Sequence, residues 1–382
     1  MSANVADVVI VGGGFMGAAT AFFLRRRGVS VILLERGLAG QQASGTNFGN
    51  VRRQGRFLEQ LPLANRSREI WGKLKELIGE DIEFIPSGHL RAGYRQQHVE
   101  RLEKYEEDSR PYGLGLEILS GRLLRERFPY LGPEVIVGSY APYDGHANPR
   151  LAAPAFARAA VRLGARVVEN TEILHVEKEG VDFRVIAADG RVFRAPAVLV
   201  TAGAWGDRIS ARFGEPVPMR AKGPQMAVTE PVPYAIAPSI SVSSERLDET
   251  FYFRQITRGN LVLGGCGHEP VDLDKRRAYV RPQHTLRQLT QMTRVVPALG
   301  HLQIIRVWSG IEGYMEDDRP VMGPSARVPG LYYAFGFSGA GFQLGPGVGD
   351  VMAELIHSGA TTTPIEAFHI ARFSRRAETT AA

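Results

Sequence analysis

Residues 8–36 read VVIVGGGFMGAATAFFLRRRGVSVILLER and decide the fold of this chain. Four apolar residues, Val8–Val11, precede three glycines and predict a buried parallel strand. Residues 15–27 carry one apolar stripe and predict a helix. Residues 29–34 predict a second strand, which a charged pair closes. This order of strand, glycine turn, helix and strand predicts the βαβ unit of a nucleotide-binding sheet.

The glycines of this stretch match the G-x-G-x-x-G fingerprint of dinucleotide-binding folds. Gly12 permits a tight turn, Gly14 the close approach of backbone to a pyrophosphate, and Gly17 the close packing of helix on sheet. The N-terminus of the helix offers free N–H groups to an anion. Glu35 lies 18 residues beyond Gly17, at the end of the second strand, where it can bind ribose hydroxyls. We therefore predict dinucleotide binding; the alternative is a glycine-rich turn in an unrelated α/β fold.

Two further features bear on the identity of the dinucleotide. An acidic residue after the second strand suits a ribose without a 2′-phosphate, as in FAD and NAD. A fingerprint at the N-terminus, combined with a glycine-rich turn at 336–349, is typical of flavoproteins. The sequence therefore favours FAD.

The rest of the chain predicts a mixture of helices and strands. The segments ARVVEN, EILHVEKEG, VDFRVIAADG and RVFRAPAVLV, within 165–200, predict an antiparallel meander that ends in a buried strand. Segment 37–56 is too polar for a core element. We expect helices over 59–78, 97–109, 150–163, 282–295 and 350–357, and strands over 219–229, 251–256, 261–265, 302–308 and 331–335.

The last strand and helix resemble the first unit more than the middle of the chain does, which predicts a discontinuous nucleotide-binding domain. We expect this FAD-binding domain to comprise residues 1–85, 145–218 and 325–382. A substrate domain is expected to comprise 86–144 and 219–324.

Composition and charge exclude several classes of protein. With 44% hydrophobic and 23% charged residues in 382, the chain is neither disordered, collagen-like nor a coiled coil. The net charge is +6, but the basic residues, mostly arginines, are spread along the whole chain. A nucleic-acid-binding protein would show a concentrated basic stripe, so we expect no nucleic-acid partner.

The single cysteine, Cys266, can form neither an intrachain disulfide nor a multi-thiolate metal site. No grouping of His, Asp and Glu has metal-ligand spacing, so we expect no metal. The uncharged stretches 8–24 and 328–349 are interrupted by glycines and do not predict a membrane span. We expect a soluble, cytoplasmic protein.

Four stretches resemble the glycine/D-amino-acid oxidase (DAO) superfamily of FAD-dependent amine oxidoreductases. They are the fingerprint with the loop QASGTNFGNVRRQGR, then NTEILHVE, VLVTAGAWGD, and RVWSGIEGYMEDDRPVMGPS with GLYYAFGFSGAGFQLGPGVG. Within the superfamily the chain looks most similar to sarcosine oxidase β, opine oxidase β and hydroxyproline or proline dehydrogenase flavosubunits. The resemblance implies an α/β protein: a Rossmann-like FAD-binding domain of the glutathione-reductase-related type, with an inserted α+β substrate domain built on a mixed sheet.

The resemblance also implies residues that surround FAD from its pyrophosphate to its flavin ring. Glu35 would hold the adenosine ribose, and Arg36 would lie near the adenine. Backbone N–H groups near the C-terminus would stabilise negative charge on the reduced ring. The full set comprises Gly12, Gly14, Phe15, Met16, Gly17, Glu35, Arg36, Ser44, Thr46, Asn47, Gly49, Asn50, Ile173, Ala202, Gly203, Gly310, Gly339, Gly341, Phe342 and Gln343.

Departures from the family pattern concern the flavin linkage and the substrate. Gly310 stands about where monomeric sarcosine oxidases have the cysteine that links flavin, and no histidine precedes His89, so we expect non-covalent FAD. Gln343 stands at the family's substrate-binding lysine, and Glu312 at the carboxylate-binding arginine of glycine oxidases. Two residues that usually bind the substrate carboxylate in this family are thus missing. The sequence therefore predicts a simple amino acid as substrate less strongly.

Candidate substrate-binding residues follow from chemistry and position. Arg53 and Arg254 suit bidentate carboxylate binding, although a surface charge is the alternative for each. Tyr252 alternates into the same face as Arg254, where core packing is equally consistent. Glu312 and Gln343 complete the candidates, and we assign no catalytic residue.

The resemblance implies oxidation of a secondary amine or an imino or D-amino acid. Hydride would pass from the substrate α carbon to flavin N5, and the imine would hydrolyse. Two alternatives stay open: a flavin monooxygenase that uses NAD(P)H, and a flavosubunit of a hetero-oligomeric dehydrogenase that is inactive alone. Val262 stands where sarcosine oxidases carry a lysine that speeds oxygen reduction. We therefore expect a dehydrogenase whose acceptor is a quinone or a partner subunit rather than oxygen.

Overall fold

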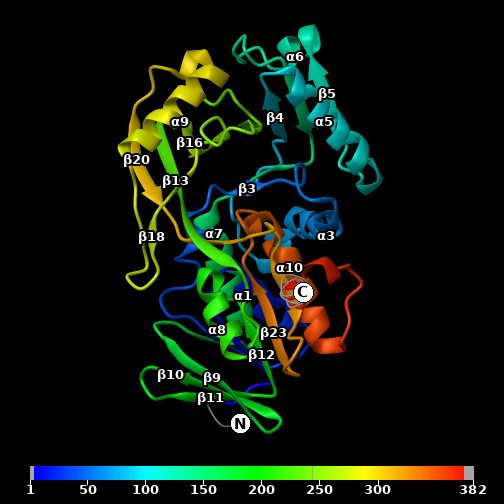
Figure 1. The fold of residues 1–382 in the computed structure, drawn as a ribbon, viewed down its shortest axis with the longest axis vertical. Coiled ribbons are helices and arrows are strands. Elements are labelled where there is room, and N and C mark those ends of the chain that lie inside the picture. Colours follow the sequence, from blue (N-terminus) through cyan, green and yellow to red (C-terminus); the bar gives the residue numbers. More distant parts are fainter. Residues whose placement is uncertain (1–3, 243, 374–382) are drawn as a thin grey trace, which may run out of the picture.

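The computed structural model describes residues 4–242 and 244–373. A six-stranded sheet lies in the lower half of the molecule and a ten-stranded sheet lies above it (Figure 1). Helices and strands are both substantial, which confirms the mixed α/β class predicted from the sequence. Within the described residues, no helix is long and apolar enough to cross a membrane.

The six-stranded sheet is built around the predicted βαβ unit. Strand β1 (Val8–Val11) lies between β2 (Val31–Leu34) and β12 (Ala197–Val200), and all three run parallel. The sheet continues to β8 (Arg166–Val168) on one side and to β23 (Leu331–Phe335) on the other. It therefore joins strands from the beginning, middle and end of the chain.

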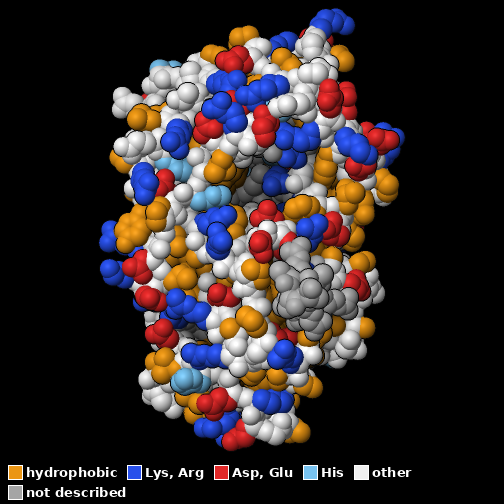
Figure 2. Space-filling view, viewed as in Figure 1, with side chains coloured by type: hydrophobic (Ala, Val, Ile, Leu, Met, Phe, Trp, Pro, Cys, Tyr) orange, Lys and Arg blue, Asp and Glu red, His pale blue; other side chains and the backbone are white. Residues whose placement is uncertain are grey.

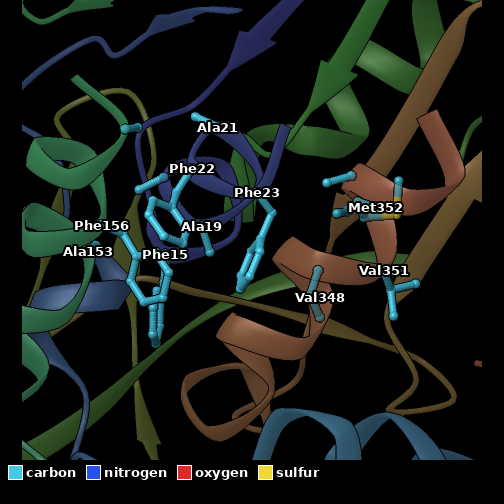
Figure 3. Packing of buried hydrophobic residues seen from close by; sticks show 14 of the residues in the cluster. Phe15, Ala19, Ala21, Phe22, Phe23, Ala153, Phe156, Val348, Val351 and Met352 are labelled. Atoms are coloured by element: carbon cyan, nitrogen blue, oxygen red, sulfur yellow. The ribbon is translucent and has the colours of Figure 1, made fainter. Parts of the chain in front are cut away.

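One face of this sheet is covered by helices. Ile10 and Leu33 point into a core shared with α1 (Phe15–Arg26), α7 (Pro149–Arg162) and α10 (Gly341–Ser358). Figure 3 shows part of this core, where the labelled side chains are Phe15, Ala19, Ala21, Phe22, Phe23, Ala153, Phe156, Val348, Val351 and Met352.

The other face is covered by a small antiparallel sheet, at the bottom of Figure 1. Its strands are β9 (Ile173–Glu179), β10 (Asp182–Ala187) and β11 (Val192–Ala195). Val9 and Ile32, which alternate with the residues of the helical face, pack against it. The predicted meander over 165–200 is found in β9, β10 and β11, and the last strand, β12, is buried as predicted. The prediction was wrong in including β8 and β12 in the meander, because they pair in parallel with β2 and β1.

Helix α10 is longer than the sequence predicted. The stretch 336–349 was expected to be a turn, but the helix begins at Gly341. Its glycines allow close packing: a Cβ at Gly345 would lie 2.5 Å from the Phe15 ring, and one at Gly349 would lie 2.5 Å from Ala19 Cβ. Glycine therefore serves helix contact here, which outweighs its poor helix propensity.

The ten-stranded sheet draws on the two stretches expected to form a substrate domain. They meet at the parallel pair β4 and β14, with all other pairs antiparallel. The strands are β4 (His89–Gly93), β5 (Glu117–Ser120), β6 (Val137–Ala141), β13 (Met219–Pro231), β14 (Ser239–Val242), β15 (Phe251–Gln255), β16 (Asn260–Gly265), β17 (His268–Glu269), β20 (Ile304–Ser309) and β21 (Glu312–Met315).

The sheets depart from the expected domain division at one strand. Strand β22 (Val321–Pro324) precedes the expected boundary at 325, yet it pairs antiparallel with β23 of the six-stranded sheet. Of the last expected FAD-binding segment, 374–382 lie outside the described residues. The division into two domains otherwise remains a prediction.

Short elements connect these layers. Predicted helix 59–78 is divided in the structure, whereas the helices expected near 97–109 and 282–295 are found. The remaining elements are α2 (Ala43–Thr46), β3 (Asn50–Val51), η1 (Leu58–Gln60), α3 (Leu61–Gly72), α4 (Leu74–Ile78), α5 (Gln96–Ser109), η2 (Arg110–Tyr112), α6 (Gly121–Arg127), β7 (Gly145–His146), η3 (Gly203–Trp205), α8 (Gly206–Arg212), β18 (Val271–Asp272), β19 (Arg277–Ala278), α9 (Pro282–Val295), η4 (Pro297–Leu299) and η5 (Glu366–Phe368).

Candidate active site

A cavity of about 680 Å³ opens between the two large sheets. It begins at the carboxyl ends of the parallel strands, beside Val11, Leu34 and Thr201. It extends to Met226 and Tyr252 on the ten-stranded sheet. Figure 2 shows a hollow in the upper half of the visible face, with Lys and Arg side chains at its rim. Open α/β sheets bind ligands at this edge.

The glycine loop after β1 lies at the lower end of the cavity. Gly12 has a φ of +115°, and a Cβ on it would lie 2.5 Å from the Thr201 carbonyl oxygen. A Cβ on Gly17 would overlap the carbonyl oxygen of Gly12, so α1 packs directly on the turn. The Phe15 N–H at the start of α1 donates to Ser44 Oγ at 2.8 Å. The loop therefore presents bare backbone beside a helix N-terminus, which suits a diphosphate.

Glu35 fixes this loop from the end of β2. Its Oε2 accepts a hydrogen bond from the Gly13 N–H, and its Oε1 accepts one from the Gly37 N–H, both at 2.7 Å. An ionised carboxylate has about four acceptor positions, so about two remain for the hydroxyls of a ribose. Glu35 can therefore shape the loop and bind a sugar at the same time.

Two planar side chains, Arg36 and Trp205, lie in the cavity next to Glu35. The Arg36 guanidinium lies 4.5 Å from the centre of the Trp205 ring and forms a 3.7 Å ion pair with Glu172. Ile173, at the start of β9, lines the cavity beside them. Such a combination of apolar and planar groups suits an aromatic base.

The loop over 43–50 runs along the middle of the cavity. Asn47 Nδ2 donates to the carbonyl oxygens of Ala43 and Ser44 at 3.0 and 2.8 Å. Its Oδ1 accepts from the Gly49 N–H at 2.8 Å. The Asn47 side chain thus holds the loop in a fixed shape, with Asn50 also lining the cavity.

The turn before α10 closes the cavity from the opposite side. A Cβ on Gly339, which has a φ of +76°, would lie 3.4 Å from Tyr314 Oη and 3.8 Å from Glu312 Oε2. Gln343 Nε2 donates to the Ala64 carbonyl oxygen at 2.8 Å. In the described part of the chain, buried Gln343 Oε1 has no hydrogen-bond donor, so it is available to a bound molecule.

Comparison with known proteins decides the family. The family model for "FAD dependent oxidoreductase" (DAO) matches residues 7–355. The chain belongs to the DAO family of FAD-dependent oxidoreductases. Glycine oxidase from Geobacillus kaustophilus is 28% identical over 375 residues, and the B subunit of opine oxidase from Rhizobium meliloti is 27% identical over 379. Each match covers 96% of this chain and 97% of the relative. The crystal structure of L-proline dehydrogenase from P. horikoshii has a TM-score of 0.91 and 27% identity, over 98% of this chain and 99% of that one.

Most of the predicted FAD-binding residues lie together around the cavity. Three do not line it: Gly17 packs α1 on the glycine loop, and Gly310 and Thr46 pack on each other. Those that line it are Gly12, Gly14, Phe15, Met16, Glu35, Arg36, Ser44, Asn47, Gly49, Asn50, Ile173, Ala202, Gly203, Gly339, Gly341, Phe342 and Gln343. The glycine loop, the Glu35 carboxylate and the unpaired Gln343 Oε1 fit the FAD that this family uses.

The predicted substrate residues divide into two groups. Tyr252, Glu312 and Gln343 line the cavity. Arg53 does not, because its guanidinium bonds to Asp144 and to Asn65 Oδ1 at 2.9 Å. Arg254 also lies behind the wall, where its Nε donates to the Phe48 carbonyl oxygen at 2.8 Å. Both arginines are buried structural groups rather than the surface charges considered as the alternative.

A cationic cluster formed by Arg52, Arg56 and Arg91 lines the upper part of the cavity, with the neutral ring of His89 beside it. Among the described residues, neither Arg52 nor Arg56 has a carboxylate partner, and the buried Arg56 Nη1 has no acceptor. Burial and neighbouring Arg52 lower the pKa of Arg56 to about 9. Burial, followed by Arg52 and Arg91, holds the pKa of His89 well below its usual value. The cluster therefore favours an anionic ligand.

Glu312 lies in the same cavity and carries the opposite charge. Its Oε2 accepts from the Tyr314 hydroxyl at 3.2 Å, and Tyr314 Oη is 3.0 Å from His268 Nε2. Burial raises the pKa of Glu312 to about 7. Both Glu312 and Arg52 contribute to the electrostatic environment of Tyr252, so acidic and basic groups approach the same part of the cavity.

Sequence reasoning missed several lining residues: His89, Arg91, Tyr314 and His268. Tyr314 could have been found, because it alternates with Glu312 on one strand and so shares its face. His89 and Arg91 alternate on β4, and His268 lies on β17; none of the three belongs to a motif. Among the described residues, no group of three or more His, Cys, Asp and Glu has a metal-binding arrangement.

Proposed function

We propose that this FAD-dependent oxidoreductase oxidises an amine that also carries a carboxylate, such as a secondary-amine, imino or D-amino acid. One observation carries the proposal. The cavity that holds the glycine loop and Glu35 at one end contains the cationic cluster and the acidic Glu312 at the other. A zwitterionic substrate satisfies both charges, and the relatives of this chain include a glycine oxidase and an L-proline dehydrogenase.

Charge complementarity assigns roles to the two groups. Arg52 and Arg56 bind the substrate carboxylate, since guanidinium groups form bidentate hydrogen bonds with carboxylates. Glu312 faces the amine. Bound FAD supplies the chemistry by accepting a hydride from the substrate α carbon at N5, which leaves an imine that water hydrolyses. The chain itself orients the substrate and keeps its two charged groups apart.

The proposed electron acceptor is a quinone or a partner protein rather than oxygen. Val262 packs with Phe48 and Met226, both of which line the cavity, whereas Leu261 and Leu263 belong to the core on the other side of the sheet. A neutral side chain at this position offers no charge to stabilise reduced oxygen. We therefore favour a dehydrogenase over an oxidase.

A second candidate is a flavosubunit that needs a protein partner. The similarity to the B subunit of opine oxidase, which is by name one part of an oxidase, favours it. Purification of the tagged chain from its native source should then yield a second polypeptide at equal stoichiometry, and turnover should require it. Full turnover of the chain alone with a soluble dye would exclude this candidate.

Analogues that lack either the carboxylate or the amine test the main proposal. The purified holoenzyme is mixed without oxygen with an amino acid, with the amine that lacks its carboxylate, and with the hydroxy acid that lacks its amine. Loss of the visible absorbance of oxidised flavin is followed for each member of several such sets. The intact amino or imino acid should reduce the flavin fastest and the hydroxy acid should not reduce it. Equal rates with and without the carboxylate would contradict the assignment of the arginines.

A further inference from the structure

Three polar side chains connect the inside of the cavity to its rim. Glu312 Oε2 is 3.2 Å from Tyr314 Oη, which is 3.0 Å from His268 Nε2. The His268 and Tyr314 rings meet edge to face, with centres 4.8 Å apart. His268 is exposed, whereas Glu312 lies beside Gly339 inside the cavity. We propose that Glu312 accepts the proton of the substrate ammonium group and that Tyr314 and His268 carry this proton to solvent.

This inference rests on the proposed function, because it supplies a step that an amine oxidation needs. The nitrogen lone pair stabilises the positive charge that develops as hydride leaves the α carbon, so the amine must first lose a proton. An amine with a pKa of about 10 is only about one part in a thousand unprotonated at pH 7. An ionised carboxylate that only contacted the ammonium group would stabilise the protonated amine. A buried carboxylate that accepts the proton instead leaves a neutral amine beside a neutral acid, and burial favours this pair over a buried ion pair.

The groups facing Glu312 suit a proton acceptor. Tyr314 faces it from its own strand, His268 from β17, Tyr252 from β15, and the Lys222 Nζ lies 4.7 Å from the Tyr314 ring centre. Among the described residues, no cation forms an ion pair with Glu312. Burial without a cation raises its pKa to about 7, so both protonation states are accessible at neutral pH.

The proton can pass from Glu312 to solvent without leaving a charge on Tyr314 or His268. While Glu312 is ionised, the Tyr314 hydroxyl donates to it. Once Glu312 is protonated, it donates to Tyr314 Oη, and Tyr314 passes its own proton to His268 Nε2. His268 then releases its Nδ1 proton to water. Desolvation of the ring where it packs on Tyr314, followed by Lys222 and His284, lowers the pKa of His268 to about 4, so the ring is neutral. It can therefore pass a proton on only if its Nδ1 proton leaves as Nε2 accepts.

The first test is the pH dependence of flavin reduction with the amino or imino acid that reduces the flavin fastest in the test above. In the wild type, kcat/KM should fall as pH drops below about 7, where Glu312 becomes protonated. Glu312→Gln should lower kcat/KM at pH 7 by about tenfold or more and lose this transition, because only free amine from solution can then react. At high pH the two enzymes should converge. Glu312→Asp should restore part of the transition.

Glu316→Gln is the matched control, because this carboxylate is exposed on the turn after the same strand. It should leave the profile unchanged. Tyr314→Phe should keep the transition near pH 7 but slow proton release, seen as a larger solvent isotope effect. Identical profiles for wild type and Glu312→Gln would overturn the proposal.

A binding measurement separates failure of this inference from failure of the proposed function. 2-Aminoisobutyrate has no α hydrogen and cannot be oxidised, but its ammonium group can contact Glu312. Its Kd, followed by the change in flavin absorbance, should rise as pH falls below about 7 in the wild type and stay level in Glu312→Gln. If no amine reduces the flavin but the pH dependence of Kd differs between the wild type and Glu312→Gln, the proposed reaction is wrong. The contact between Glu312 and the ammonium group is then still supported. If the two Kd profiles coincide, the inference fails whatever reduces the flavin.

Discussion

Glu35 joins two loops that surround the nucleotide end of the cavity, through its hydrogen bonds from Gly13 and Gly37. Glu35→Ala should weaken FAD binding by roughly 1.5–3 kcal/mol, as expected for hydrogen bonds to a charged group. The measurement is the quenching of flavin fluorescence when FAD is added to apoprotein.

Glu169→Ala is a suitable control for Glu35→Ala. Its Oε1 accepts a 2.7 Å hydrogen bond from the Ala39 N–H, but it does not line the FAD cavity. FAD affinity should therefore be unchanged in this variant. An equal loss in both variants would mean that Glu35 acts through general stability rather than at the nucleotide.

Gly310 gives a prediction about how the flavin is held. A Cβ at this position would overlap Thr46 Oγ1, and the Trp308 indole N–H donates to the Thr46 carbonyl oxygen at 2.8 Å. Glycine has no side chain that could bond to the flavin, so we expect FAD to be held without a covalent bond at this position. Acid precipitation should release the yellow colour into the supernatant, whereas colour retained in the pellet would demonstrate a covalent bond.

At the residue scale, the sequence predicted the residues that line the cavity near the glycine loop better than those that line its opposite end. The glycine loop and Glu35 belong to one continuous motif, so their spacing in the sequence was enough to predict that they lie close together. The proposed substrate end is assembled from separate strands and loops. The sequence could not determine that Arg53 faces Asp144 while Arg52 faces the cavity. The side a residue faces depends on loop geometry, which no periodicity encodes.

Helix α10 provides the clearest prediction at the scale of an element. Gly349→Ala adds a Cβ that would lie 2.5 Å from Ala19 Cβ and 2.7 Å from the backbone of Ala19. We expect destabilisation by about 1–3 kcal/mol, because overpacking outweighs the gain in helix propensity. Urea unfolding measures it.

Gly72→Ala is the control for helix propensity alone. Gly72 ends α3, and a methyl group added there would have the flexible end of Arg68 as its nearest neighbour, at 3.3 Å. This change should be neutral or stabilising by up to about 1 kcal/mol. Stabilisation by Gly349→Ala as well would show that α10 and α1 do not pack as closely as described.

The same helix explains which elements sequence could predict. Helix α9 was found because it buries one face, and burial of one face imposes a helical period on the sequence. Helix α1, which is buried on almost all sides, was found because the glycine fingerprint marks its beginning. The first half of α10 was missed because its glycines reflect contact with α1 and α3 rather than a turn. Strand partners were missed in β8 and β12, because short apolar strands do not encode whether they pair in parallel.

At the scale of the whole molecule, the proposed electron acceptor can be tested at the face of the ten-stranded sheet that packs toward the cavity. Val262→Lys would add a cation on the face of β16 that packs against the cavity-lining residues Phe48 and Met226. Turnover with oxygen should rise by about tenfold or more relative to a dye, as electrostatic stabilisation of developing charge predicts. The measurement compares both acceptors in air-saturated and oxygen-free buffer.

Val262→Met is the neutral control for this change and should leave the ratio of the two acceptors unaltered. If wild-type turnover with oxygen already equals turnover with the dye, the chain is an oxidase and another cation serves oxygen. Lys222, whose Nζ lies over the ring of Tyr314, would then be the residue to substitute.

The central claim is that FAD and an amine substrate that carries a carboxylate bind in the same cavity. A single turnover without oxygen, with the amino or imino acid that reduces the flavin fastest, tests it most directly. One carbonyl product should form for each FAD reduced, and NADPH alone should leave the flavin oxidised. Reduction of the flavin by NADPH, together with no carbonyl product from any amine, would contradict the account and indicate a monooxygenase.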